Sequence, residues 1–272
     1  MAGVILAQLD HPDAAPRVLA AAACLAQLIS ASLINVLVVR TPPSSTITPE
    51  EILTWRVEQV VRGVEQRRAD LLKASYDDWA ISVSGDTVTE WIDIEGLADR
   101  VMDEWGRRSD FIVLKRPTER RPDQEQRALH AALFSTGRPA LLVPPEPPSA
   151  LFGRRVAIAW REDGRTIKAV LSALRLAGHA EQIHVLAGTR DPKSPPRLPD
   201  ILAEHDINAI LHVLPIIRQR AFGEALLDAA HQLGADMLVM GAFAHHPVRN
   251  FILGGVTRYM LSRADLPVIM RH

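Results

Sequence analysis

Short apolar runs rich in β-branched residues alternate along this chain with longer amphipathic or alanine-rich segments. The apolar runs predict buried strands, and the segments between them have the length and periodicity of helices. In the first half we expect strands at 4–7, 33–39, 88–94, 111–114 and 140–143, and helices at 14–30, 50–75, 97–107 and 124–135. Apolar strands separated by helices are typical of a parallel sheet covered on both faces.

The same alternation starts again after the densest proline cluster of the chain, residues 144–149. Proline lacks a backbone N–H and favours extended structure, so this cluster predicts a linker. Beyond it we expect strands at 155–160, 183–186, 209–217, 237–240 and 267–270, and helices at 165–177, 198–205, 221–233 and 256–263. The predicted domains are therefore residues 1–146 and 152–272.

The two halves read as diverged copies of one unit. Residues 109–114 correspond to 235–240, and residues 138–143 correspond to 266–270. Each half alternates five strands with four helices. Because crossovers between parallel strands are right-handed, we expect an α/β fold with two tandem Rossmann-like domains, each a five-stranded parallel doubly wound sheet.

Charge and cysteine content indicate which partners and which cellular compartment to expect. The 272 residues include 31 basic and 32 acidic side chains, a net charge of -1, which argues against a nucleic-acid or membrane partner. Cys24 is the only cysteine, so no internal disulfide can form and a cytoplasmic location is expected. The uncharged run 18–39 splits by periodicity into a helix and a strand rather than a membrane span, and no basic region of a secretory signal precedes it.

Residues 241–257 hold the candidate chemistry. Gly241 follows a buried strand, at the edge of the sheet where doubly wound folds bind ligands. Gly254 and Gly255 open a helix, where free N–H groups suit a phosphate, and Arg249 adds a charged donor. Ordinary turn and capping chemistry also places glycine before helices, so this second reading stays open.

In these residues the sequence resembles the universal stress protein family in its tandem form, most clearly over 234–241, 254–257 and 266–269. ATP-binding members carry Gly-x2-Gly-x9-Gly-Ser/Thr after the fourth strand. Gly241 and Gly254 match its first and third glycines, whereas Ala244 replaces the second and Gly255 the hydroxyl residue. A positive φ at Ala244 would cost about 1 kcal/mol. Thr257 could supply a hydroxyl instead.

The resemblance implies a cytoplasmic stress-response protein that binds ATP or another adenine nucleotide weakly in its second half, with no metal beyond a nucleotide-associated Mg. By this resemblance the expected binding residues are Ala159 and Arg161 beside the base, with Gly241, Ala244, Arg249, Gly254, Gly255, Val256 and Thr257 along the ribose and phosphates. Arg161 stands where the family has an acid or amide.

The first half keeps the family's first-strand acid but lacks its glycine motif, the reverse of the second half. Asp10 matches the family's first-strand acid, but residues 115–122 contain no glycine and are expected to form a solvated charged loop. The first site is thus expected to be degenerate.

Two further functions compete with nucleotide binding. One is a nucleotide-independent scaffold, in which strands 140–143 and 267–270 pair within the chain or join two copies as a homodimer. The other is a slow nucleotide hydrolase, for which His245 and His246 are the nearest candidate bases. No catalytic or metal-binding residue is assigned, and the chain is expected to be a binding protein.

Overall fold

The computed structural model describes residues 3–45, 54–83, 86–117, 123–145, 152–191, 193–216, 222–242, 244–245 and 252–272, except the side chains of 123, 177, 244, 245, 252 and 253. The chain divides into two compact units, Met1–Arg138 and Pro139–His272. Residues 146–151 of the predicted linker region lie outside the described residues, so the predicted domains 1–146 and 152–272 stay a prediction.

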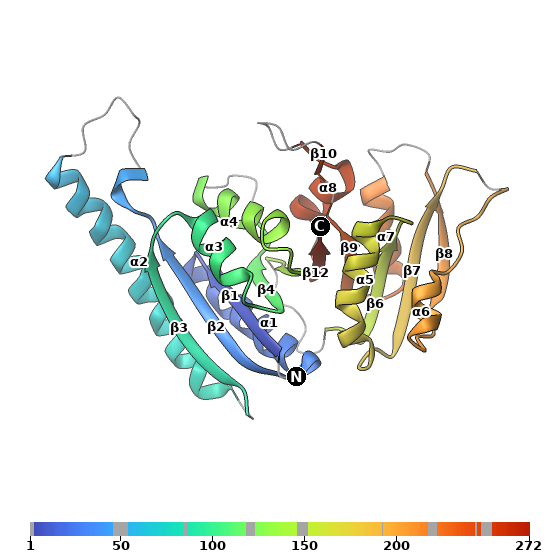
Figure 1. Ribbon diagram of the computed structural model, residues 1–272, viewed down its shortest axis with the longest axis horizontal. Helices are drawn as coiled ribbons and strands as arrows, with labels where there is room; N and C mark the ends of the chain where they lie inside the picture. Colours follow the sequence, from blue (N-terminus) through green and yellow to red (C-terminus); the bar gives the residue numbers. More distant parts are fainter. Residues whose placement is uncertain are drawn as a thin grey trace. The chain divides into compact units, whose positions relative to one another are not determined.

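The first unit is built on a parallel sheet with two helices on each face (Figure 1). Its strands lie in the order β3-β2-β1-β4, with β1 at Gly3–Leu9, β2 at Ala31–Arg40, β3 at Val88–Glu95 and β4 at Phe111–Lys115. One face carries α1 (Ala15–Ile29) and α2 (Trp55–Ser82), and the other carries α3 (Ala98–Gly106) and α4 (Asp123–Phe134). Two single-turn helices, η1 (Pro12–Ala14) and η2 (Pro43–Ser45), follow β1 and β2.

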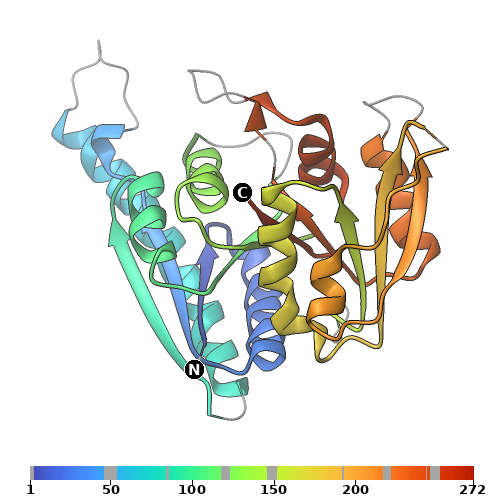
Figure 2. The same cartoon turned by 45° about the vertical axis from the view of Figure 1, so that its right-hand side comes forward.

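The second unit repeats this plan (Figure 2). Its parallel strands lie in the order β12-β9-β6-β7-β8, with β6 at Arg155–Trp160, β7 at Gln182–Thr189, β8 at Ile210–Pro215, β9 at Met237–Gly241 and β12 at Val268–Arg271. The helices are α5 (Gly164–Ala177) and α6 (Asp200–Glu204) on one face, and α7 (Phe222–Gln232) and α8 (Gly255–Arg263) on the other. The predicted α/β fold with mostly parallel, doubly wound sheets is therefore confirmed.

Two strand pairings go beyond that expectation. β5 (Ala140–Val143) pairs antiparallel with β12, with Leu142 opposite Val268. β10 (Ala244–His245) and β11 (Ile252–Leu253) form a short antiparallel ribbon between β9 and α8. Strands of two residues leave no periodic pattern in a sequence, which explains why this ribbon was not predicted.

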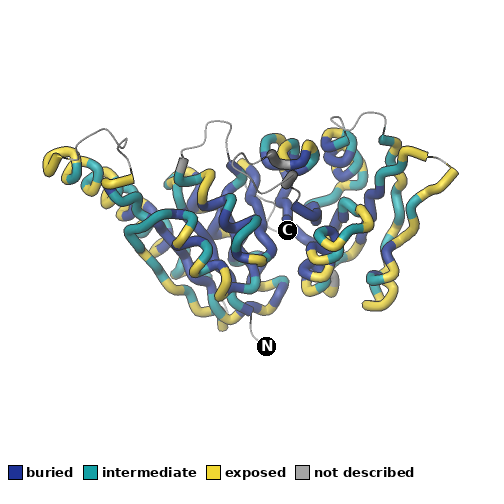
Figure 3. The backbone as a smooth tube through the Cα atoms, turned by 45° about the horizontal axis from the view of Figure 1, so that its top comes forward, coloured by how far each residue is buried: buried dark blue, intermediate teal, exposed yellow. Residues whose placement is uncertain are grey.

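The core of each unit lies between its sheet and its helices (Figure 3). The central strands β1, β4, β9 and β12 are almost entirely buried, whereas the edge strands β3 and β8 are partly exposed. No helix within the described residues is long and apolar enough to cross a membrane, and the apolar run 18–39 falls within α1 and β2.

One aspartate in each unit supports the reading of the halves as a repeat. Asp110 precedes β4, and its carboxylate accepts the backbone N–H of Val4 at 2.8 Å. Asp236 precedes β9, and its carboxylate accepts the N–H groups of Gly153 at 2.7 Å and Arg155 at 3.2 Å. In each unit, the aspartate before the fourth strand thus holds the start of the first strand next to it.

Helix α2 is longer than the periodicity predicts. The expected helix at 50–75 continues to Ser82, and its described part begins at Trp55. The Tyr76 ring lies 6.0 Å from the Trp79 ring and 5.3 Å from the Trp91 ring of β3. This aromatic packing extends the helix by almost two turns across the edge of the sheet.

A histidine pair is buried beside the sheet of the second unit. His184 of β7 is 5% exposed, and its Nδ1 lies 3.1 Å from Nε2 of His212 on β8. Burial lowers the pKa of His184 below the ordinary value, and the nearby His212 and Arg155 lower it further. His184 is therefore favoured as a neutral imidazole in the folded state.

Candidate functional site

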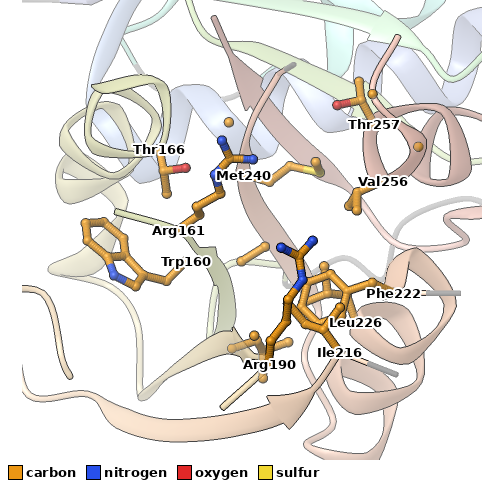
Figure 4. A pocket seen from close by; sticks show the side chains of 16 residues that line it. Trp160, Arg161, Thr166, Arg190, Ile216, Phe222, Leu226, Met240, Val256 and Thr257 are labelled. Carbon is orange, nitrogen blue, oxygen red and sulfur yellow. The ribbon is translucent and has the colours of Figure 1, made fainter. Parts of the chain in front are cut away.

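A pocket of about 530 Å³ opens at the carboxyl ends of β6, β7 and β9 in the second unit (Figure 4). This is the edge of a doubly wound sheet at which ligands bind, and the volume lies in the ordinary range for a small-molecule site. The residues that line it are Ala159, Trp160, Arg161, Thr166, Leu186, Gly188, Arg190, Ile216, Phe222, Leu226, Met240, Gly241, Gly254, Gly255, Val256 and Thr257.

The structure brings most of the predicted binding residues to this one pocket. Seven of the nine line it: Ala159, Arg161, Gly241, Gly254, Gly255, Val256 and Thr257. Ala244 lies in β10 with its side chain undescribed, so its expected part in binding stays a prediction. Arg249 lies outside the described residues.

The N-terminus of α8 opens onto the pocket through a pair of glycines. Gly254 is the N-cap residue, with φ -56° and ψ 148°, and its carbonyl accepts the first helical hydrogen bond from Arg258 N at 2.9 Å. The N–H groups of a first helical turn have no partner within the helix and lie at its positive end. The end of α8 thus presents the polar groups that bind a phosphate, and no acidic side chain stands in this turn.

A second wall of the pocket is apolar. Ile216, Phe222 and Leu226 form it, and the absence of a side chain at Gly188 makes room for it. A Cβ at Gly188 would stand 2.5 Å from Phe222 Cζ and 2.7 Å from Ile216 Cδ1. This wall offers the flat apolar surface that a base or another aromatic group needs.

The end of β6 carries a cation where the family has an acid or amide. Arg161 lines the pocket, and its Nε lies 3.0 Å from Oδ2 of Asp163. Asp163 caps α5, because its Oδ1 accepts the N–H groups of Arg165 and Thr166, each at 3.0 Å. The carboxylate is therefore engaged with the protein itself, and none of the described lining residues is acidic.

An ion-pair network lies at the corresponding strand end of the first unit. Lys115, which ends β4 as Gly241 ends β9, is 8% exposed and not part of the solvated loop that the sequence suggested. Its Nζ lies 2.9 Å from Oε1 of Glu125 and 3.5 Å from Oδ1 of Asp10. Burial raises the pKa of Asp10, and the Lys115 cation opposes part of that rise.

Helix α2 completes this network in the first unit. The Arg68 guanidinium donates to the carbonyl of Asp10 at 3.0 Å and to that of Val39 at 2.7 Å, and it pairs with Glu65 at 2.8 Å. These contacts fill the ends of β1, β2 and β4 with the chain's own charges. A lysine thus stands in the first unit at the strand position that Gly241 holds in the second.

Sequence reasoning missed half of the pocket. Thr166, Arg190 and the apolar wall come from α5, the end of β7 and the segment from β8 to α7, far along the chain from the glycine motif. Gly188 and Arg190 at the end of an apolar strand were the available signal, because that edge of the sheet was already the expected site.

Neither a metal centre nor a catalytic base can be assigned from the described residues. No group of three or more His, Cys, Asp or Glu side chains in that part of the chain could hold a metal ion. His245 contributes backbone to β10 with its side chain undescribed, and His246 lies outside the described residues. The hydrolase hypothesis therefore stays a prediction.

Comparison with known proteins finds a family match for the second unit and a fold match for the whole chain. Residues 171–272 match the model of the Universal stress protein family. A crystal structure of a universal stress protein from Archaeoglobus fulgidus matches at a TM-score of 0.70 and 13% identity, over 99% of this chain and 96% of that one. A putative universal stress protein from Pseudomonas aeruginosa matches at a TM-score of 0.57 and 14% identity, over 99% and 93%. No curated protein matches the sequence.

Fold and pocket together define a tandem α/β protein with a ligand-sized site at the carboxyl ends of its second sheet. Residues 171–272 are similar to the universal stress protein family, and the fold of a solved universal stress protein extends over the whole chain. The resemblance seen in the sequence is thereby confirmed. Family and fold support a role in the stress response.

Proposed function

We propose that this chain is a cytoplasmic binding or regulatory protein of the stress response, whose second unit binds an adenine nucleotide weakly. The observation that carries the proposal is the N-terminus of α8, which opens through Gly254 and Gly255 onto a pocket of about 530 Å³. The single cysteine, Cys24, is in keeping with a reducing compartment.

The residues present fit such a ligand. The first turn of α8 would hold the phosphates, and the apolar wall of Ile216, Phe222 and Leu226 would take the base. A magnesium ion would be held by the phosphates alone, because the described lining residues supply no carboxylate. Weak binding is expected, since Gly255 keeps the backbone donor of the family's hydroxyl residue but not the hydroxyl.

Calorimetric titration of the intact chain with ATP and ADP, with and without magnesium, tests the proposal. We expect heats that fit a dissociation constant between about 10 μM and 1 mM, and a thermal shift that grows with nucleotide concentration. Absence of both heat and thermal shift at millimolar nucleotide would refute nucleotide binding.

A nucleotide-independent scaffold remains the second candidate, and the pairing of β5 with β12 favours it. These are the strands expected to pair within the chain. A homodimer would then use another edge, such as β8, where Ile210 is 55% and Val213 is 40% exposed. Light scattering over a range of protein concentrations would show the dimer, and a monomer at every concentration would exclude it.

A further inference from the structure

The wall of the pocket formed by the ends of β6 and β7 is positively charged. Arg161 follows Trp160, the last residue of β6, and Arg190 follows Thr189, the last residue of β7. These strands are parallel neighbours, with Trp160 opposite Ala187, so their carboxyl ends meet at the same edge of the sheet. Figure 4 shows both guanidinium groups directed into the space that the lining residues enclose.

Little negative charge opposes this wall. The Arg161 guanidinium is partly compensated by Asp163, which is itself engaged in capping α5. The side chain of Arg190 makes no ion pair and no hydrogen bond with another of the described residues, and none of the described lining residues is a carboxylate. The described side chains that line this wall therefore include two cations and no carboxylate.

A buried hydroxyl group next to this wall also lacks a partner. Thr166 is 1% exposed, and its Oγ1 has no hydrogen-bond partner among the described residues. Figure 4 shows this side chain at the lining of the pocket, and Asp163 is contacted both by the Thr166 N–H at 3.0 Å and by the Arg161 Nε at 3.0 Å. Leaving a buried hydroxyl unpaired costs free energy, which an oxygen atom of a ligand at this wall would recover.

The arginine wall is separate from the N-terminus of α8. In Figure 4, Trp160 and Thr166 lie on one side of Met240, and Val256 and Thr257 lie on the other. A ligand with two phosphate groups at different positions satisfies both positive features at once. A ligand that carries phosphate at only one position would leave either the N-terminus of α8 or the two arginines without an anion.

We infer that the second unit selects a nucleotide phosphorylated at two places, with its 5′-phosphate at the first turn of α8 and a 2′- or 3′-phosphate of the ribose at Arg161 and Arg190. This inference rests on the proposed nucleotide binding and specifies its ligand. Arginine suits this role because its planar guanidinium can donate two parallel hydrogen bonds to one phosphate.

The test compares three ligands that carry two phosphates each on the same nucleoside: ADP, adenosine 3′,5′-bisphosphate and adenosine 2′,5′-bisphosphate. Titration of the intact chain without magnesium keeps all three ligands free of metal, and at neutral pH each bisphosphate carries about one more negative charge than ADP. We expect one bisphosphate to bind at least about tenfold more tightly than ADP, and its identity gives the position of the second phosphate.

Two variants separate the arginine wall from a general electrostatic effect. Arg190→Gln removes an exposed cation of the pocket, and we expect it to reduce the advantage of the bisphosphate over ADP to about twofold or less. Arg197→Gln removes an exposed arginine that does not line the pocket, and it should leave the advantage intact. Thermal unfolding without ligand verifies that both variants fold.

The outcomes distinguish the inference from the proposal beneath it. If ADP binds and neither bisphosphate binds more tightly, the inference falls and nucleotide binding stands. If the advantage survives in Arg190→Gln, or is lost equally in Arg197→Gln, the arginine wall is not the second phosphate site. If none of the three ligands binds, both fall together.

Discussion

An acidic residue at the start of α8 should raise the stability of the protein and weaken its nucleotide binding. Gly255 is exposed, and a Cβ added there meets no heavy atom within 4 Å. Its φ also lies outside the region that L side chains avoid. Gly255→Asp therefore fits without a clash, which separates its electrostatic effect from any effect of bulk.

The two expected effects have opposite signs. Without ligand, a carboxylate in the first turn of α8 replaces a poor helix former and faces the positive end of the helix, which should stabilise the fold by about 0.5–1 kcal/mol. With ligand, the same carboxylate stands where the phosphate is proposed to bind. The repulsion should weaken ADP binding at least about tenfold, or 1.4 kcal/mol.

Thermal unfolding measures the first effect and calorimetric titration with ADP the second. Gly255→Asn is the matched control, because it has the shape of the aspartate without the charge and should retain ADP binding. Unchanged ADP affinity in Gly255→Asp would refute the placement of the phosphate at α8. An equal loss in both variants would show that bulk, not charge, is responsible.

The buried charges and the buried histidine give two further predictions. Lys115→Ala leaves carboxylates buried without their cation, so it should lower the free energy of unfolding, measured in urea, by about 3–5 kcal/mol. The control Lys73→Ala breaks an exposed ion pair and should lower it by less than about 1 kcal/mol. Equal losses in the two variants would contradict the buried network. Because the folded pKa of His184 lies below its unfolded value, its contribution to stability is complete above about pH 6.5 and is lost as the pH falls toward the folded pKa. The pH dependence of unfolding between about pH 6.5 and 5 should be weaker in His184→Gln, by up to about 1.4 kcal/mol per pH unit, and unchanged in the surface variant His205→Gln.

The fold was predictable because each main element leaves its own pattern in the sequence. Buried parallel strands leave apolar runs, so the strands appear in the order and at the places that the pattern indicates. The direction in which two strands pair leaves no such pattern in the sequence. The scaffold hypothesis named 140–143 and 267–270 as pairing strands, but the antiparallel direction of β5 against β12 has no signal in the sequence, and neither has the ribbon of β10 and β11. The extension of α2 depends on the contact of Tyr76 with Trp91.

The site was predictable only where it is contiguous in the sequence. The glycine motif from Gly241 to Gly255 can be found by spacing, and the structure brings it to the pocket. The apolar wall and Arg190 come from other elements, and only the fold shows that they face the same space. The burial of Lys115 was likewise hidden, because a lysine after a strand normally reaches solvent.

The central claim is that the second unit alone keeps a nucleotide site, while Lys115 and its partners fill the first. The number of ADP molecules bound per chain at saturation, measured by equilibrium dialysis on the intact protein, tests it most directly. The account predicts one ADP per chain in the unaltered protein, bound at least about tenfold more weakly in Gly255→Asp. Two ADP per chain, or one that binds Gly255→Asp with unchanged affinity, would contradict it.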